Sequence, residues 1–298
     1  MQVFLAILPI FGLIVLGYVM GRREWLSPAS MGGLMTLTFK LFMPALLFSG
    51  IVKADLAHGL SIRLLMAYFL PVLAAFLVVN ALMHRRWKAP TTQGLSVSYS
   101  NNVLIGIPMV SGLLGPDKLI YVYSILTLHS LVLFTLQSFY TAFGGRDKVS
   151  PKALFMSLAN PLVIGLVSGG AINLSGIDLP EPLWQMVSWL GQAGLPCALI
   201  VLGVNLSRYR LLPSRTVVEL TLGKLVLFPL IVYFFSAILG LDPIARSVLL
   251  LMAACPTGVN VLGFTRTPED NRIASSTVFL TTAASILTLP LWMVAVGH

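Results

Sequence analysis

The sequence predicts an all-α polytopic membrane protein. Ten transmembrane helices are expected to form two inverted five-helix repeats, with helices 4 and 9 broken where they cross. Three observations predict this fold class. Hydrophobic residues make up 57% of the 298 residues and charged residues only 10%, whereas a soluble domain has about 25% charged residues. Apolar stretches of about 20 residues, enough to cross a bilayer, recur along the chain, and prolines recur at matched distances in its two halves.

The ten predicted spans follow one another with short connections that contain most of the charged residues. The first span begins almost at once and has no basic residues before it, so we interpret it as a spanning helix and not as a cleavable signal. Each span is apolar nearly all round, as expected for packing against lipid and neighbouring helices. The spans are expected at 2–21, 30–52, 61–83, 92–114, 118–142, 153–173, 183–206, 214–239, 244–265 and 271–296.

The distribution of Lys and Arg predicts the orientation. The loops after spans 1, 3, 5, 7 and 9 contain thirteen of the nineteen Lys and Arg residues, and the opposite loops contain four. Because basic loops stay on the cytoplasmic side, we expect a multi-pass protein of the cytoplasmic (inner) membrane with both termini on the outer side. The net charge of +9 is then explained by orientation and by attraction to anionic lipid. The basic loops are too short and scattered to bind nucleic acid.

Matched prolines predict an internal repeat. Four ordered pairs lie about half the chain apart, namely Pro9 and Pro161, Pro44 and Pro196, Pro71 and Pro229, and Pro108 and Pro256. A repeat of five spans has an odd count, so its second copy enters the membrane upside down, as in many transporters. The first repeat is expected at 1–149 and the second at 150–298.

Spans 4 and 9 contain the most informative segments, SVSYSNNVLIGIPMVSGLLG and LLLMAACPTGVNVLGF. Proline and glycine near the middle of an apolar helix interrupt it, and such interruptions persist where the backbone lines a cavity or meets other protein. Asparagine side chains can donate and accept hydrogen bonds there. Each interruption also creates a half-helix whose first amides favour an anion. Two interruptions that meet at mid-membrane would therefore form an anion site, although a packing kink is the alternative for each.

Charged residues inside the predicted spans are few. Lys224 lies near mid-depth in span 8, where it attracts an anionic substrate, exchanges a proton or extends toward an interface. We interpret Lys40 in span 2 as a structural residue. Glu219 is expected to pair with Arg215 one turn away, and the other nine carboxylates are expected in loops, which argues against a cation as substrate. The Ser and Thr residues of span 10 are interpreted as forming hydrogen bonds between helices, with a sodium site as the alternative.

Several segments resemble those of the auxin efflux carrier family, which is related to the bile acid/sodium symporter superfamily. They are SYSNNVLIGIP, CPTGVN followed by RIASSTVFLTTAASILTLPLW, PIFGLIVLGYVMGRR and KLFMPALLFSGI. The family usually has Gly-Asn-Thr-Gly where this chain has Ser-Asn-Asn-Val at 100–103, and the long cytoplasmic loop of the plant carriers is absent. The chain therefore resembles a short prokaryotic member.

The resemblance implies a scaffold of spans 1, 2, 6 and 7 that forms a homodimer, and a transport domain of spans 3–5 and 8–10 that moves like an elevator. It assigns the substrate to the crossing of the broken helices, at Asn101, Ile107, Pro108, Pro256, Val259 and Asn260. Together with the residues of the two interruptions, the candidate substrate-binding residues are Asn101, Asn102, Gly106, Ile107, Pro108, Pro256, Thr257, Gly258, Val259, Asn260 and Lys224.

We therefore expect a secondary transporter of a small organic anion, a carboxylate such as malate, malonate or an auxin-like acid, coupled to protons or sodium. A sodium-coupled symporter of the bile-acid type and a non-transporting membrane receptor or subunit remain alternatives. An enzyme is not expected, because the sequence contains no Ser/His/Asp set and no phosphate-binding loop. His129 has no metal-binding partner at helical spacing, and Cys197 and Cys255 are interpreted as small core residues, so neither a metal nor a cofactor is expected.

Overall fold

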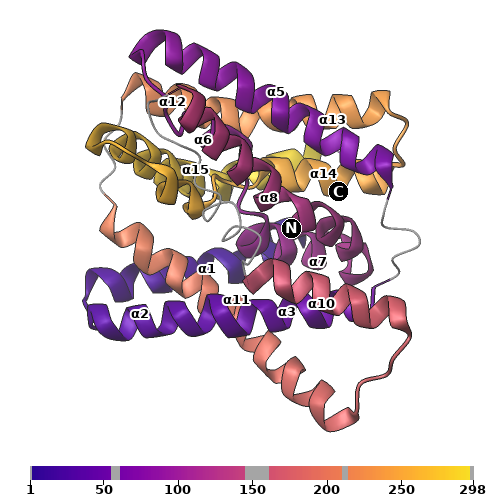
Figure 1. Cartoon of the computed structure of the whole chain (residues 1–298). Coiled ribbons are helices and arrows are strands. Elements are labelled where there is room, and N and C mark those ends of the chain that lie inside the picture. The colour runs from indigo at the N-terminus through magenta and orange to yellow at the C-terminus, as the bar shows by residue number, and fades with distance from the viewer. Residues whose placement is uncertain (1, 55–60, 145–160, 210–213, 296–298) are drawn as a thin grey trace.

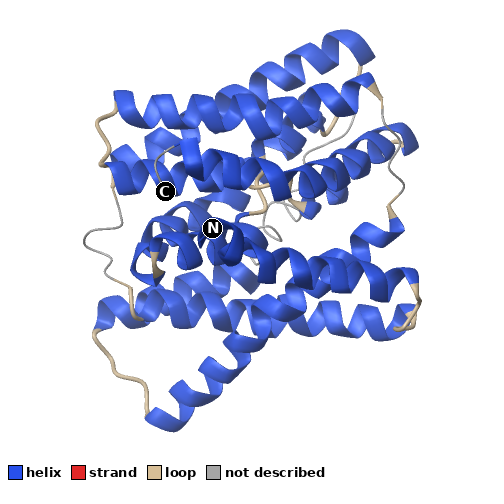
Figure 2. Ribbon diagram, turned by 180° about the vertical axis from the view of Figure 1, so that it is seen from behind, coloured by secondary structure: helices blue, strands red, loops and turns tan. Residues whose placement is uncertain are grey.

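The computed structural model describes residues 2–54, 61–144, 161–209 and 214–295. Within these ranges the chain is helical apart from turns, short loops and one isolated β-bridge, as Figure 2 shows. The helices in chain order are α1 (Gln2–Arg22), α2 (Pro28–Leu37), η1 (Thr38–Phe42), α3 (Met43–Val52), α5 (Ile62–Trp87), α6 (Gln93–Ser98), η2 (Asn102–Gly106), α7 (Ile107–Leu114), η3 (Pro116–Lys118), α8 (Leu119–Gly144), α10 (Pro161–Ser175), α11 (Glu181–Arg208), α12 (Arg215–Leu222), η4 (Gly223–Leu227), α13 (Phe228–Ile238), α14 (Pro243–Ala254), η5 (Val259–Phe264) and α15 (Pro268–Ala295). The first part of the sixth predicted span, 153–160, lies outside the described residues, as do several of the basic loop residues within 145–160 and 210–213.

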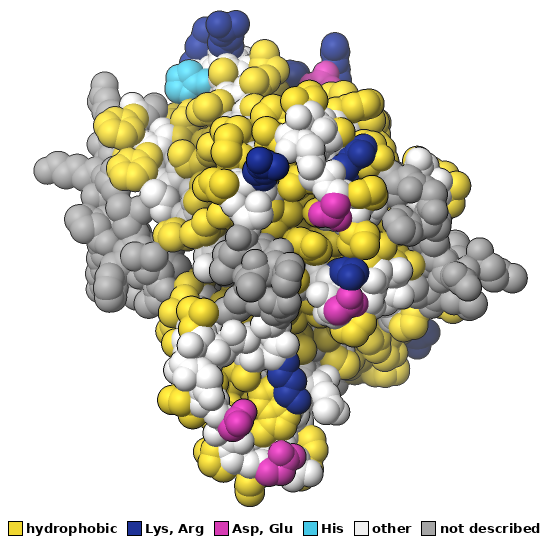
Figure 3. Space-filling model, turned by 90° about the vertical axis from the view of Figure 1, so that its right-hand side faces the viewer, with side chains coloured by type: hydrophobic (Ala, Val, Ile, Leu, Met, Phe, Trp, Pro, Cys, Tyr) yellow, Lys and Arg dark blue, Asp and Glu magenta, His cyan; other side chains and the backbone are white. Residues whose placement is uncertain are grey.

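Length and composition identify the helices that can cross a membrane. Among the described residues, six helical stretches are long and apolar enough, and four shorter apolar helices accompany them. Large hydrophobic side chains such as Phe143, Ile238 and Leu287 are more than half exposed, as expected for surfaces that contact lipid. Figure 3 shows one side of the molecule, where hydrophobic side chains are widespread and several Lys, Arg, Asp and Glu side chains lie among them. The chain is therefore a multi-pass membrane protein.

The helices pack as two groups. The first group, α1, α2, η1, α3, α10 and α11, has its largest contacts between α1 and α11 and between α3 and both α10 and α11. The second group contains α5–α8 and α12–α15 with their η segments, and its largest contacts join α5 to α6 and α13 to α14. Figure 1 shows the first group in the lower part of the molecule and most of the second group above it. Contacts between the groups are sparse by comparison.

Glycines let the first group pack closely. A Cβ atom at Gly17 of α1 would collide with the backbone of Ile200 in α11, and one at Gly203 would collide with the carbonyl oxygen of Ile14. Small residues allow membrane helices to approach this closely, because their association depends on van der Waals packing. The α1–α11 contact therefore depends on glycine at both positions.

Three short π-helical turns, η1, η2 and η4, each end two residues before a proline, namely Pro44, Pro108 and Pro229. Proline has no N–H group, and its ring clashes with the carbonyl group four residues earlier. A wider turn moves that carbonyl aside while the helix continues. In η4 the carbonyl oxygen of Leu225, four residues before Pro229, instead accepts a hydrogen bond of 2.8 Å from Nε1 of Trp292.

Candidate functional site

The first interruption lies between α6 and η2. Helix α6 ends at Ser98, Tyr99 has extended backbone angles, and Asn101 has φ −77° and ψ 58°. The π-turn η2 then precedes α7, where Pro108 occupies one of the first two positions. A proline fits at this position because the first amides of a helix have no partner within it. The sequence prediction of a broken fourth span is therefore reproduced in the backbone.

The second interruption lies between α14 and η5. Helix α14 ends at Ala254, and Cys255 and Gly258 both have extended backbone angles. A Cβ atom at Gly258 would lie 2.5 Å from the ring of Tyr99, so only glycine fits against that ring. The chain continues as the 3-10 helix η5 and not as a full α-helix.

The two interruptions contact each other directly. Ser100 and Thr257 form an antiparallel β-bridge. The N–H of Asn101 donates to the carbonyl oxygen of Pro256 at 2.8 Å, and the N–H of Gly258 donates to the carbonyl oxygen of Tyr99 at 3.0 Å. These two amides join the interruptions and are therefore not available to an anion. The sequence analysis expected the first amides of each half-helix to bind the anion, and that expectation does not hold for these two. We call this pair of joined interruptions the crossover.

Lys224 lies at the crossover. Its side chain is fully buried, so it does not extend to a membrane interface. Its ammonium group donates to Oγ of Ser100 at 2.5 Å and to the carbonyl oxygen of Ala253 at 3.0 Å, and so contacts both interrupted helices. Among the described residues, none of the ion pairs includes Lys224. A buried ammonium without a carboxylate partner is costly in free energy.

A small cavity opens at the crossover. Its volume is about 20 Å³, enough for roughly one water molecule. Nδ2 of Asn101 and Oδ1 of Asn102 are buried and have no hydrogen-bond partner. Unpartnered buried polar atoms are uncommon in proteins, so these two mark a place for a ligand or water. The residues that line this crossover cavity are Phe39, Tyr99, Ser100, Asn101, Asn102, Val103, Leu104, Leu126, His129, Leu162, Gly258, Val259 and Asn260.

Aromatic side chains hold the crossover from the α8 side. The ring of Tyr99 stacks on His129 with centroids 4.7 Å apart, and the hydroxyl of Tyr99 accepts a hydrogen bond of 3.2 Å from Nδ2 of Asn260. Nδ2 of Asn102 donates to the hydroxyl of Tyr68 at 2.9 Å, and that hydroxyl lies 3.3 Å from Nε2 of His129. Sequence reasoning did not select Tyr99 or His129, because their stacking is a contact between distant parts of the chain.

The structure divides the candidate residues into two sets. Asn101, Asn102, Gly258, Val259 and Asn260 line the crossover cavity. Thr257 does not reach this cavity: it is fully buried, with its hydroxyl donating to the carbonyl oxygen of Ser96 at 2.6 Å. The residues that do not line this cavity are Gly106, Ile107, Pro108, Pro256, Thr257 and Lys224.

A wider groove adjoins the cavity. It has a volume of about 420 Å³ and shares Phe39, Leu162, Val259 and Asn260 with the crossover cavity. We call it the outer groove. It is lined by Gly32, Met35, Thr36, Phe39, Lys40, Pro161, Leu162, Asn205, Val259 and Asn260.

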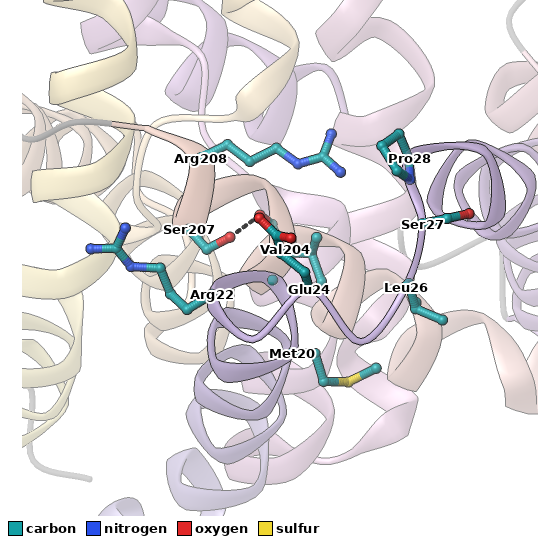
Figure 4. A pocket seen from close by; sticks show the side chains of 10 residues that line it. Met20, Arg22, Glu24, Leu26, Ser27, Pro28, Val204, Ser207 and Arg208 are labelled. Atoms are coloured by element: carbon teal, nitrogen blue, oxygen red, sulfur yellow. Dashed lines mark hydrogen bonds between the residues drawn. The ribbon is translucent and has the colours of Figure 1, made fainter.

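Another pocket of about 450 Å³ lies at the ends of α1 and α11, away from the crossover. Figure 4 shows Arg22 and Arg208 extending to different sides of it, and the hydroxyl of Ser207 bonded to the carbonyl oxygen of Val204. The side chains of Arg22, Glu24 and Arg208 are exposed. Without unpartnered buried polar atoms, this pocket is a weaker candidate for a specific site than the crossover.

Asp270 differs from the sequence expectation. We expected it in a loop, but it lies in the first turn of α15 and is only 5% exposed. Its Oδ1 accepts hydrogen bonds from the backbone N–H and hydroxyl of Thr92 and from Nε2 of Gln93, at 3.1, 3.0 and 2.7 Å. Asp270 therefore joins the start of α6 to the start of α15. The expected pair of Arg215 and Glu219 is confirmed, with Nε and Oε1 2.7 Å apart.

Metal binding finds no support in the described residues, where no three His, Cys, Asp or Glu side chains form a group that could hold an ion. The hydroxyls of α15 mostly bond within their own helix: Thr277 donates to Ile273 and Ser285 to Thr282. Thr281 also accepts the backbone N–H of Thr257 at 3.2 Å. The hydroxyl of Thr281 therefore links α15 to the second interruption.

This architecture, apolar helices around two joined interruptions, defines a membrane transport protein. The chain belongs to the family described as membrane transport protein, whose family model matches residues 2–293. The resemblance to the auxin efflux carrier family is thereby confirmed, and the family match indicates a transporter and not an enzyme.

Individual relatives span most of the chain. A protein of Rhizobium meliloti (strain 1021) named "Putative malonate transporter" is 29% identical over 297 residues, covering 95% of this chain and 92% of the relative. A protein of Methanothermobacter thermautotrophicus named "Uncharacterized transporter" is 25% identical and covers 97% of this chain and 96% of its own length. The "Lysosomal cholesterol signaling protein" of Mus musculus is 23% identical over 77% of this chain, but only over 29% of its own longer sequence.

Proposed function

We propose that the protein is a secondary transporter that moves a small organic anion, a carboxylate, across the cytoplasmic membrane, with the crossover as its binding site. The observation that supports this most directly is Lys224, a fully buried ammonium with no carboxylate partner among the described residues, bonded to both interrupted helices. An anion in the crossover cavity, next to the Ser100 hydroxyl that accepts from Lys224, would offset part of the cost of the buried charge. The unpartnered Nδ2 of Asn101 would donate to that anion.

The packing of the helices supports an elevator mechanism. The first group would be the scaffold and would form a homodimer, and the second group would be the transport domain and would move with the crossover. Sparse contacts between the groups favour such a movement, because little packing must be broken. The two inverted five-helix repeats, the orientation with both termini outside, and coupling to protons or sodium complete the proposal. The name of the Rhizobium relative makes malonate the first substrate to test.

Substitutions at the crossover test this site. In liposomes loaded with malonate or malate, we expect the parent protein to exchange labelled malonate, and Asn101→Ala or Asn260→Ala to weaken affinity about ten-fold, the cost of one hydrogen bond to a charged group. Lys224→Met should slow exchange more strongly, because it removes the positive charge. Asn271→Ala and Lys118→Met are matched controls, since both residues lie outside the crossover cavity and the outer groove, and both should exchange at the parent rate.

The outcomes separate the alternatives. Unchanged affinity in both asparagine variants would remove the crossover from the binding site. Exchange that disappears when sodium is replaced by potassium would favour a sodium-coupled symporter of the bile-acid type. Folded parent protein that exchanges none of a broad panel of organic acids would favour a receptor or subunit without transport activity.

A further inference from the structure

The crossover cavity is too small for an organic acid. Its volume of about 20 Å³ holds roughly one water molecule, whereas sites for small organic ligands commonly measure about 300–1,000 Å³. The outer groove, at about 420 Å³, falls within that range. Because the two share Asn260 and Val259, a ligand in the outer groove can contact the crossover at one end.

Lys40 is the one charged residue among the described residues that line the outer groove. It lies in the π-turn η1, midway along the span Pro28–Val52. It lies twelve positions after Pro28, the first residue of that span, which corresponds to about 18 Å along a helix, farther than a lysine side chain can reach. It therefore cannot extend its ammonium group to the near interface, and an ammonium at this depth in lipid is costly.

The contacts of Lys40 leave its charge available. Its side chain is exposed, and the ion pairs of the described residues do not include it. Asn205 of α11 lines the same groove and can donate further hydrogen bonds. The sequence interpretation of Lys40 as a structural residue rested on the view that the first group does not contact substrate. The outer groove is nevertheless lined by both groups, since it brings Lys40 of the first group and Asn260 of the second group to one space.

We infer that Lys40 binds a second carboxylate group, so that the outer groove and the crossover together select short dicarboxylates over monocarboxylates. This inference rests on the proposed function. One carboxylate of the ligand lies at the end of the outer groove that Val259 and Asn260 share with the crossover cavity. The other lies in the outer groove and pairs with Lys40. The apolar side chains of Phe39 and Leu162, which line both spaces, contact the carbon chain that joins the two carboxylates.

Malonate and its monomethyl ester provide a matched pair of probes, because they share the malonyl skeleton and differ by one negative charge and the ester methyl group. Affinities are measured by competition with labelled malonate and by ligand-induced thermal shift on the purified full chain. The parent should bind malonate more tightly than the monoester. In Lys40→Met the affinity for malonate should fall about ten-fold more than that for the monoester, equivalent to about 1.4 kcal/mol.

Three further variants control for the charge at position 40, for net charge and for folding. Lys40→Arg should restore most of the preference, because it restores the charge. Lys53→Met is the control for net charge, since Lys53 lies at the end of α3 against Trp184 and outside the outer groove, and its preference should equal that of the parent. If Lys40→Met does not fold, Lys40→Gln keeps a polar side chain of similar length without the charge and decides the same question.

Each result has one meaning. An unchanged preference for malonate in Lys40→Met and Lys40→Gln overturns the role of Lys40, and so does a parent that prefers the monoester or another monocarboxylate. In both cases the proposed function still stands. Parent protein that is folded but binds neither acid and exchanges none of the panel overturns the proposed function itself, and with it this inference.

Discussion

The indole of Trp292 supplies a hydrogen-bond donor that the sequence of α13 lacks. Pro229 has no N–H to offer the carbonyl of Leu225, and Nε1 of Trp292 donates to that carbonyl from α15 at 2.8 Å. An unsatisfied carbonyl in a membrane is costly. The same turn contains Lys224, so the bond also holds the π-turn that directs this lysine to the crossover.

Replacing this donor should weaken the fold. We expect Trp292→Phe to lower the free energy of unfolding by about 1 kcal/mol, because a buried carbonyl loses its partner while most of the apolar contact remains. Thermal unfolding in detergent measures the change. Trp25→Phe is the control, since Trp25 is 63% exposed, and it should melt as the parent does. Equal melting temperatures for Trp292→Phe and parent would show that water or another group satisfies Leu225.

At the residue scale the sequence predicted the asparagines of the candidate site, but not the side chains that contact them. Asn101 and Asn260 could be selected because a polar amide side chain is unusual in the middle of an apolar span. Lys224 could not be assigned from the sequence, because a lysine at mid-depth can extend along a helix or turn inward, and only the packing of α14 decides. Tyr99 and His129 could not be selected from the sequence. Their rings stack between distant parts of the chain, and no local sequence pattern predicts that contact.

At the element scale, α6 depends on another helix for its stability. It contains six residues, Gln93–Ser98, and isolated helices this short do not form in water. The carboxylate of Asp270 fixes its first turn by accepting three hydrogen bonds from Thr92 and Gln93. Since α6 leads directly into the first interruption, α15 indirectly positions Asn101.

Removing this anchor should loosen α6. We expect Asp270→Ala to increase hydrogen exchange across 93–98 and to reduce substrate affinity, because three buried donors lose their acceptor. Asp270→Asn keeps an oxygen in place and should have a smaller effect. Glu269→Ala is the control, because Glu269 forms an exposed pair with Arg272 and such pairs contribute little. If α6 exchanges equally slowly in Asp270→Ala and the parent, other contacts hold it.

The elements themselves were largely predictable. Hydropathy located the described helices within a few residues, because the length of a span is set by the bilayer. The π-turns were not predicted, since proline marks a disturbance of the helix but not how the helix accommodates it. The placement of Asp270 in a loop was wrong because charged residues after a proline are typical of a loop, whereas here Pro268 begins a helix and the charges occupy its first turn.

At the scale of the whole molecule, the orientation remains a prediction from the basic loops. A variant with Cys197→Ser and Cys255→Ser provides a background without cysteine. In that background, Asp178→Cys should react with an impermeant maleimide on intact cells, and Glu24→Cys should react only after permeabilisation, because the positive loops stay inside. Reaction of the two positions in the reverse order would contradict the orientation with both termini outside.

The β-bridge between Ser100 and Thr257 makes the two interrupted helices a single mechanical unit. Pulling them apart would break the two backbone bonds that flank the bridge and at least one of the two bonds of Lys224, which has one bond to each interrupted helix. In an elevator mechanism, a substrate bound at the crossover would keep the same contacts with the transport domain throughout the movement. Any difference in substrate affinity between the inward-facing and outward-facing states would then arise from the scaffold helices. They would place Lys40 beside the substrate in one state and a different surface beside it in the other.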